Sequence, residues 1–129
     1  MTRPIVSGAT FPVPPKRLYD IFMTSKLHSA AIGAPATISP KVGGKFSVWG
    51  GEITGKTLHL VPGKLIVQTW RASHWKKSDP DSILVVRFSG TASAGRMDLV
   101  HEGVPAHDHK GVTGGWSSFY WKPWKAYLG

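Results

Sequence analysis

Residues 114–124 read GGWSSFYWKPW and place five aromatic side chains within eleven positions. Around this stretch, apolar residues recur every three or four positions, which is the pattern of an amphipathic helix over about 108–128. The predicted apolar stripe consists of Val112, Trp116, Phe119, Tyr120, Pro123 and Tyr127. Asp108 is suited to be the N-cap of this helix, because aspartate accepts hydrogen bonds from the first helical N–H groups.

Two features of the segment disfavour a regular helix. Gly114 and Gly115 each cost about 1 kcal/mol relative to alanine, which is acceptable if the helix backbone must approach a sheet closely. Pro123 has no N–H to donate to the carbonyl of Phe119, so we predict a bend there.

The residues before this segment show the sequence pattern of an antiparallel sheet. Short alternating runs are separated by Gly, Pro, Asp and Ser, with no crossover helices between them. A first strand over 5–13 precedes two short helices, 15–24 and 26–32; Ser25 is the expected cap of the second helix, which ends at Gly33. The further strand runs are 43–51, 52–61, 64–72, 83–90 and 95–102. The predicted fold class is α+β, a curved antiparallel sheet wrapped around a long C-terminal helix.

Charged positions orient most of these strands. Arg96, Asp98 and Glu102 share one face of 95–102, so the other face points toward the helix. The same argument orients 43–51, 64–72 and 83–90, whereas 53–61 gives no clear orientation. The inward residues and two residues of the helix form the predicted ligand-binding set: Phe46, Gln68, Trp70, Leu84, Val86, Phe88, Met97, Leu99, His101, Trp116 and Tyr120. Large aromatic side chains can bridge a curved gap without filling it, so this set lines either a ligand cavity or a packed core.

The composition bounds the function. The 129 residues suit one domain, 1–129. There are no cysteines, which excludes disulfides and thiolate metal sites. The formal charge is +9, but the basic residues are scattered, so we expect a solvated surface and no nucleic-acid binding. The absence of long apolar runs and of a secretory-signal pattern predicts a cytoplasmic protein with no membrane insertion.

Catalytic and metal sites are weakly indicated. His107 and His109 flank Asp108, but without recognised ligand spacing we interpret them as solvated loop histidines and predict no metal and no cofactor. No inward carboxylate pair exists for acid–base hydrolysis, and Ser117 and Ser118 lack a nucleophile-elbow context. No residue is assigned a catalytic role.

Several stretches together resemble a known family. They are LYDIF (18–22), APATISPKVGGKFSVWGG (34–51), ITGKTLHLVPGKLIVQTWR (53–71), HEGVP (101–105) and GWSSFYWKPWKAYL (115–128). This ordered set, from about Thr10 onward, is similar to the C-terminal domain of the activators of the ninety-kilodalton heat-shock protein ATPase and to their stand-alone prokaryotic relatives.

The resemblance implies the helix-grip fold of START-like (SRPBCC) and birch-pollen-allergen-like domains, a superfamily that binds apolar small molecules between sheet and helix. The eukaryotic co-chaperone also carries an N-terminal domain central to ATPase stimulation, for which 129 residues leave no room. We therefore expect, at most, a weaker chaperone contact.

Three functional hypotheses follow. The first is a non-enzymatic domain that binds a small hydrophobic or aromatic molecule. The second is a protein-interaction, co-chaperone-like module that contacts a heat-shock chaperone. The third is a cyclase-like enzyme in which His101 acts as acid or base, because imidazole titrates near neutral pH. The sequence makes no prediction of oligomeric state.

Overall fold

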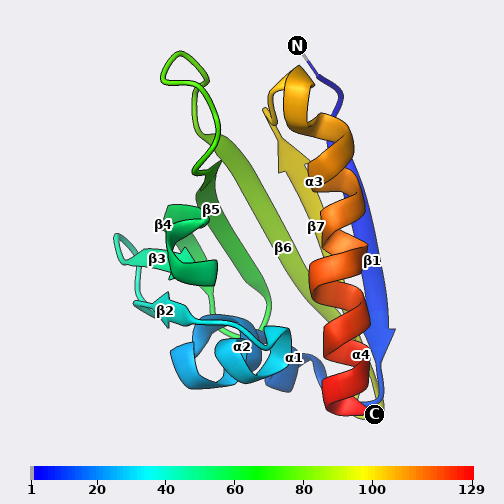
Figure 1. Ribbon diagram of the computed structural model, residues 1–129. Coiled ribbons are helices and arrows are strands. Elements are labelled where there is room, and N and C mark those ends of the chain that lie inside the picture. The colour runs from blue at the N-terminus through cyan, green and yellow to red at the C-terminus, as the bar shows by residue number, and fades with distance from the viewer. Residues whose placement is uncertain (1) are drawn as a thin grey trace.

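A computed structural model describes residues 2–129 and shows one curved antiparallel sheet that faces a long C-terminal helix (Figure 1). The seven strands lie in the order β1-β7-β6-β5-β4-β3-β2, and every neighbouring pair is antiparallel. They are β1 (Ile5–Phe11), β2 (Ala36–Ile38), β3 (Lys45–Val48), β4 (Ile53–Val61), β5 (Leu65–Ala72), β6 (Ser82–Thr91) and β7 (Ala94–Glu102). The predicted fold class is confirmed, and β2 is a short edge strand that the sequence pattern did not indicate.

The predicted inward faces are correct. Leu84 pairs with His101, Val86 with Leu99 and Phe88 with Met97, and all six side chains are buried. The inward face of strand β4 could not be predicted from its sequence because the strand contains a β-bulge between Thr57 and His59. The extra residue shifts the alternation of side chains between the two faces, so no single parity describes this strand.

The two short helices, α1 (Pro15–Met23) and α2 (Ser25–Ile32), close one end of the sheet (Figure 1). Helix α2 ends at Gly33, whose φ of 69° is the left-handed conformation that favours glycine at this position. The predicted capping role of Ser25 is wrong, since Thr24 occupies the N-cap position. The Ser25 hydroxyl instead accepts a hydrogen bond from Ile38 N–H at 2.7 Å, which ties α2 to β2.

The C-terminal rod has three segments: α3 (His109–Trp116), a π-helical turn (Ser117–Trp121) and α4 (Lys122–Leu128). In the π-helical turn the N–H of Lys122 donates to the carbonyl of Ser117, five residues earlier. Pro123 lies in the first turn of α4, where its missing N–H is tolerated. The disturbance expected at this proline thus takes the form of a π-helical turn, and the rod continues through it (Figure 1).

This turn changes which aromatic residues face the sheet. An α-helix rotates about 100° per residue, so in a regular helix the side chains of Trp116 and Trp121 would point about 140° apart around the axis. The one extra residue in the π-helical turn removes about 100° of this angle, so both side chains point to nearly the same face. Trp121 is accordingly 6% exposed and Trp124 0% exposed. The predicted stripe is wrong at Phe119 within the turn and at Tyr127 after it, because Phe119 is 58% exposed and Tyr127 is 39% exposed.

Hydrogen bonds from three of these aromatic side chains hold the rod in place. Trp116 Nε1 donates to His101 Nδ1 on β7 at 3.2 Å. Trp121 Nε1 donates to Ser7 Oγ on β1 at 2.8 Å. The Tyr120 hydroxyl donates to His28 Nε2 on α2 at 2.9 Å.

His28 completes this last contact to the short helices. Its Nδ1–H donates to the carbonyl oxygen of Phe22 at 2.8 Å, so Nε2 is left to accept the hydrogen bond from Tyr120. The side chain is 2% exposed and its ring meets the Tyr120 ring edge to face. The short helices are thereby joined to the middle of the C-terminal rod.

Replacing Tyr120 with phenylalanine tests this contact. The change removes one oxygen and leaves a buried lone pair on His28 without a donor, which we expect to lower the free energy of unfolding by about 1–3 kcal/mol. Chemical denaturation with an unchanged m-value measures the difference. Tyr127→Phe is the matched control at a more exposed position and should shift the midpoint little; equal midpoints for both variants would contradict the assignment.

Candidate functional site

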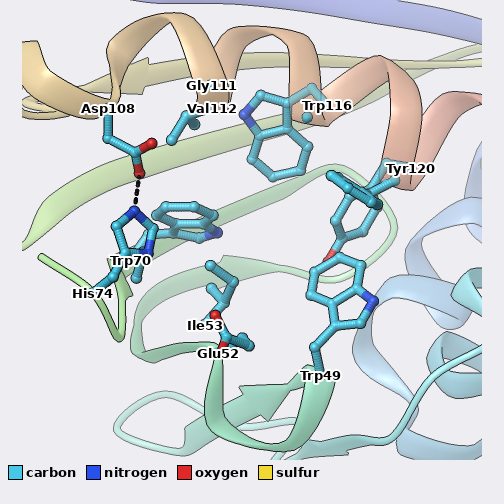
Figure 2. Close-up of a pocket in the computed structure, with 13 residues that line it drawn as sticks. Trp49, Glu52, Ile53, Trp70, His74, Asp108, Gly111, Val112, Trp116 and Tyr120 are labelled. Atoms are coloured by element: carbon cyan, nitrogen blue, oxygen red, sulfur yellow. Dashed lines mark hydrogen bonds and ion pairs between the residues drawn. The ribbon is translucent and has the colours of Figure 1, made fainter.

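A pocket of about 390 Å³ lies between the start of the C-terminal rod and the β4–β5 side of the sheet (Figure 2). It is mostly apolar and is walled by residues from the turn before β4, from the end of β5 and from one face of the rod. The lining residues are Trp49, Glu52, Ile53, Trp70, Ala72, His74, Asp108, Gly111, Val112, Gly115, Trp116, Phe119 and Tyr120. Its size and apolar lining are typical of small-molecule sites.

Trp49 forms the wall opposite the rod. Its ring meets the Phe119 ring at 5.9 Å and the Tyr120 ring at 5.6 Å between centroids, both edge to face. Trp49 is also the one non-glycine residue with a positive φ, 52°, in the described chain, and Gly50 and Gly51 after it have φ of 64° and 96°. A bulky residue in this conformation is strained, so the surrounding structure must hold it there. Such strained residues cluster at active and binding sites.

Glycines in α3 leave the space that the pocket occupies. A Cβ at Gly115 would make only an ordinary van der Waals contact with the Phe119 ring, so a larger side chain there would extend into the pocket. A Cβ at Gly114 would meet nothing within 4 Å. A Cβ at either glycine would meet no atom of the sheet within 4 Å, so the condition of a close backbone approach to the sheet is met at neither position.

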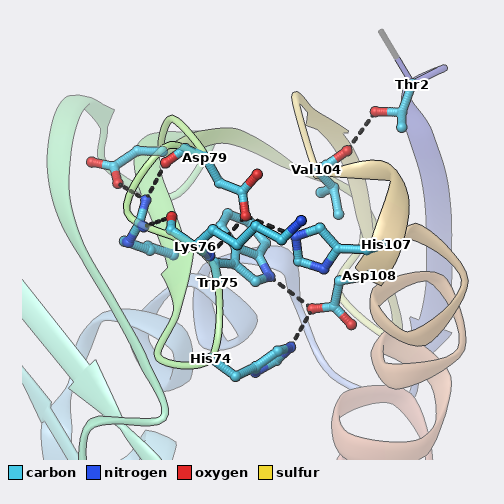
Figure 3. Close-up of polar contacts among 10 residues, drawn as sticks. Thr2, His74, Trp75, Lys76, Asp79, Val104, His107 and Asp108 are labelled. Atoms are coloured by element: carbon cyan, nitrogen blue, oxygen red, sulfur yellow. Dashed lines mark hydrogen bonds and ion pairs between the residues drawn. The ribbon is translucent and has the colours of Figure 1, made fainter.

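Asp108 anchors the rim at the start of the rod (Figure 3). It occupies the predicted N-cap position, but its carboxylate makes no capping hydrogen bond. Its Oδ2 instead accepts hydrogen bonds from Trp75 Nε1 at 2.7 Å and from His74 Nε2 at 2.9 Å. The loop after β5 is in this way tied to the first turn of α3.

A second polar contact joins the same loop to the same corner. His107 Nε2 lies 2.7 Å from Asp79 Oδ2, and this hydrogen bond holds the pKa of the Asp79 carboxyl below its usual range. Arg71 also donates to the carbonyl oxygens of Lys76 and Asp79, each at 2.6 Å. Loop 73–81 is thus an ordered part of the pocket rim.

The structure separates the predicted site residues into two groups. Trp70, Trp116 and Tyr120 line the pocket. The other eight are buried on the inner face but do not line it: Phe46, Gln68, Leu84, Val86, Phe88, Met97, Leu99 and His101. Side chains from the rod and from α1 fill that part of the interior; Tyr19, for example, packs edge to face on Phe88 at 5.5 Å.

The other ten lining residues were not in the predicted ligand-binding set. Ile53 is the first residue of β4, the strand that could not be oriented from its sequence. Glu52, His74 and Asp108 lie in turns and at a helix start, where no alternating pattern applies. A usable signal was the pair Gly50 and Gly51 directly after Trp49, because paired glycines mark a special backbone conformation beside a large aromatic residue.

His101 lies in a closed hydrogen-bond chain and is 0% exposed. Its Nδ1 accepts from Trp116, so Nε2 carries the proton and donates to Ser82 Oγ at 2.8 Å; the Ser82 hydroxyl donates to the Trp70 carbonyl at 2.6 Å. Burial lowers the pKa of His101 to about 3, with a smaller contribution from the charge of His109. Both ring nitrogens are therefore occupied by protein partners.

Residues 2–129 contain no group of three histidine, aspartate or glutamate side chains arranged to hold a metal ion. His109 Nε2 instead hydrogen-bonds the carbonyl of Arg3 at 2.8 Å. Within the same described range, each helix is too short or too polar to cross a lipid bilayer.

Comparison with known proteins agrees with this architecture. Residues 12–129 match the family model described as Activator of Hsp90 ATPase homolog 1-like protein. The chain belongs to this family. The human Activator of 90 kDa heat shock protein ATPase homolog 1 is 32% identical to it over 120 residues, which are 93% of the chain and 35% of the human protein. The chain thus spans about a third of the length of that curated family member.

Solved structures of other proteins share the fold. An HSP90 activator from Plasmodium falciparum superposes with a TM-score of 0.87 at 24% identity, covering 98% of this chain and 96% of the other. The Aha1 dimer from Colwellia psychrerythraea superposes with a TM-score of 0.79 at 14% identity, covering 98% and 96% of the two chains. At these identities the likeness is one of fold.

The two buried histidines predict how stability depends on pH. Burial lowers the pKa of His28 to about 4 and that of His101 to about 3, whereas both are near 6.5 in the unfolded chain. Below about pH 6.5 the unfolded state therefore binds protons that the folded state does not, and the free energy of unfolding falls as pH falls. Two such groups give a limiting slope of about 2.7 kcal/mol per pH unit.

Urea denaturation between about pH 4.5 and pH 6 measures this slope. His101→Gln should remove about half of it, whereas His59→Gln, at an exposed position on β4, should leave it unchanged. A wild-type stability that is flat over this range, or a slope that both variants preserve, would contradict the burial of neutral histidines.

Proposed function

We propose that this family member is a non-enzymatic binding module for a small hydrophobic or aromatic molecule, held between the C-terminal rod and the β4–β5 side of the sheet. The observation that carries the proposal is the apolar pocket of about 390 Å³ walled by Trp49, Trp70 and Trp116 (Figure 2). A rigid aromatic wall favours a flat ligand, because stacked and edge-to-face contacts form at little entropic cost.

The pocket also has features that a packing defect lacks. Trp49 has a left-handed backbone conformation beside the pocket, and Gly115 has no side chain that would fill the pocket. Both features lower the stability of the fold, and the helical glycine alone costs about 1 kcal/mol relative to alanine. A ligand of two fused rings that buries about 200 Å² of apolar surface would gain roughly 5 kcal/mol before the entropic cost of binding.

Filling the pocket from the rod is the most direct test. Gly115→Leu should abolish binding of the neutral dye N-phenyl-1-naphthylamine, because the new side chain enters the cavity. The same variant should be more stable than the wild type, since leucine is the better helix former by somewhat under 1 kcal/mol. Dye fluorescence and thermal unfolding measure the two effects.

Gly114→Leu is the matched control. It makes the same substitution one residue earlier, at an exposed position where a Cβ meets nothing within 4 Å. It should keep dye binding while gaining similar helix stability. If the wild type binds no dye, or if both variants bind it equally, the proposed function fails.

We propose as a second candidate a co-chaperone-like contact with a ninety-kilodalton heat-shock chaperone. It rests on family membership and on the names of the relatives, and a net charge of +9 suits an acidic partner. Because the chain covers only 35% of the human relative, ATPase stimulation by this chain is itself part of the proposal. Both candidate roles assume a cytoplasmic protein.

Measuring the ATPase rate and the affinity of the chaperone with increasing amounts of this chain separates the two candidates. A co-chaperone-like module should bind in a salt-sensitive way that Gly115→Leu leaves unchanged, since surface charge and not the pocket makes the contact. A chaperone that neither binds the chain nor changes its ATPase rate at low salt overturns the second candidate and leaves the first intact.

A further inference from the structure

We propose that the pocket selects a positively charged ligand, an aromatic or alkyl ammonium compound. This inference deepens the proposed function and rests on it. It concerns the charge of the ligand, which neither the apolar lining nor the fold determines.

The charge of the pocket lining is opposite in sign to the net charge of the chain. The chain has sixteen Lys and Arg against seven Asp and Glu. The pocket reverses this balance, because its lining includes the carboxylates of Glu52 and Asp108 but no lysine or arginine. A basic protein therefore has two carboxylates at the rim of this apolar pocket, and the local field there favours a cation.

The carboxylate of Asp108 has one oxygen that accepts no hydrogen bond from the described residues. The bonds from His74 and Trp75 both end on Oδ2, and none of the hydrogen bonds among residues 2–129 ends on Oδ1. The carboxylate is held by these two donors, so its second oxygen is fixed at the rim without further ordering cost (Figure 3).

Glu52 lies on the sheet side of the pocket and is held in a similar way. Its Oε2 accepts from Ser73 Oγ at 3.2 Å, and its backbone carbonyl accepts from Ser73 N–H at 2.8 Å. The two carboxylates thus come from different walls, one from the start of the rod and one from the turn before β4 (Figure 2).

Most side-chain hydrogen-bond donors around the pocket already donate to protein acceptors. Trp116 Nε1 donates to His101, the Tyr120 hydroxyl donates to His28, and His74 Nε2 donates to Asp108. The indole N–H groups of Trp49 and Trp70 remain, and they are neutral. The charged groups offered to a ligand are therefore acceptors, which match an ammonium group and repel a carboxylate.

The aromatic wall supports the same class of ligand. An ammonium group near the faces of tryptophan and tyrosine rings gains cation–π attraction, and this attraction is larger where water is partly excluded. Aromatic side chains combined with carboxylates at the rim are the arrangement by which proteins bind alkylated ammonium groups.

Three ligands that share a naphthalene ring and differ only in the terminal group test the inference. They are 2-(1-naphthyl)ethylamine, 2-(1-naphthyl)ethanol and 1-naphthaleneacetate, titrated by calorimetry at low salt and about pH 8, where histidine is neutral. We expect the amine to bind on the order of tenfold more tightly than the alcohol, and the carboxylate to bind most weakly despite the net charge of +9. Added salt should narrow the difference between amine and alcohol.

Rim variants locate the effect. Glu52→Gln and Asp108→Asn keep the side-chain size and one acceptor oxygen, replace the other oxygen with an NH2 donor and remove one charge each, so each should reduce the preference for the amine while alcohol binding stays unchanged. Glu102→Gln is the matched control, since it removes a charge from an exposed position on β7 outside the pocket lining.

The outcomes separate the two proposals. If none of the three ligands binds, the proposed function fails. If the alcohol binds but the amine is not preferred, or if the carboxylate binds best, the pocket binds ligands and the inference about charge is overturned. The same conclusion follows if Glu102→Gln weakens the amine as much as Glu52→Gln does. Should a rim variant unfold, the ranking of the three ligands on the wild type still decides.

Discussion

The arrangement depends on how the C-terminal rod is attached to the rest of the fold. Its three side-chain hydrogen bonds to the sheet and short helices end on Ser7 of β1, His101 of β7 and His28 of α2. Ser7 and His101 lie on the neighbouring strands β1 and β7, and His28 lies on one of the short helices that close one end of the sheet (Figure 1). On the β4–β5 side the rod is met by the ring of Trp49, and α3 presents glycines there. A rod fixed along one side and bridged by an aromatic residue on the other leaves space between, and the pocket occupies that space.

The π-helical turn makes this attachment possible. Trp116 and Trp121 are five residues apart, and in an α-helix they would point to different faces. With the turn inserted, both indole N–H groups reach partners on the sheet, and Trp124 is completely buried below them. The exposed ring of Phe119 is the consequence on the opposite side, where it forms part of the pocket wall. One irregularity in the helix therefore sets both the core and the site.

Much of the fold follows from the sequence, because alternation and periodicity are local properties. Strand faces such as Met97, Leu99 and His101 were predictable from the charges between them. The features that could not be predicted depend on irregular backbone. The bulge at Thr57 interrupts the alternation from which β4 would have been oriented, and the π-helical turn shifts the apolar face of the rod beyond Trp116. Trp70, Trp116 and Tyr120 are the lining residues that belonged to the predicted binding set, whereas Trp49, Glu52, His74 and Asp108 come from turns and a helix start, which show no alternating pattern.

The most direct measurement is the tryptophan indole region of a ¹H–¹⁵N NMR spectrum, recorded while 2-(1-naphthyl)ethanol is added, with the six signals assigned by single Trp→Phe variants. The account predicts that the signals of Trp49, Trp70 and Trp116 move with a common saturation curve, since these rings line the pocket. The signals of Trp121 and Trp124, which are buried in the core outside the lining, should stay in place. Movement of those two signals while the other three remain fixed, or no movement at all, would contradict it.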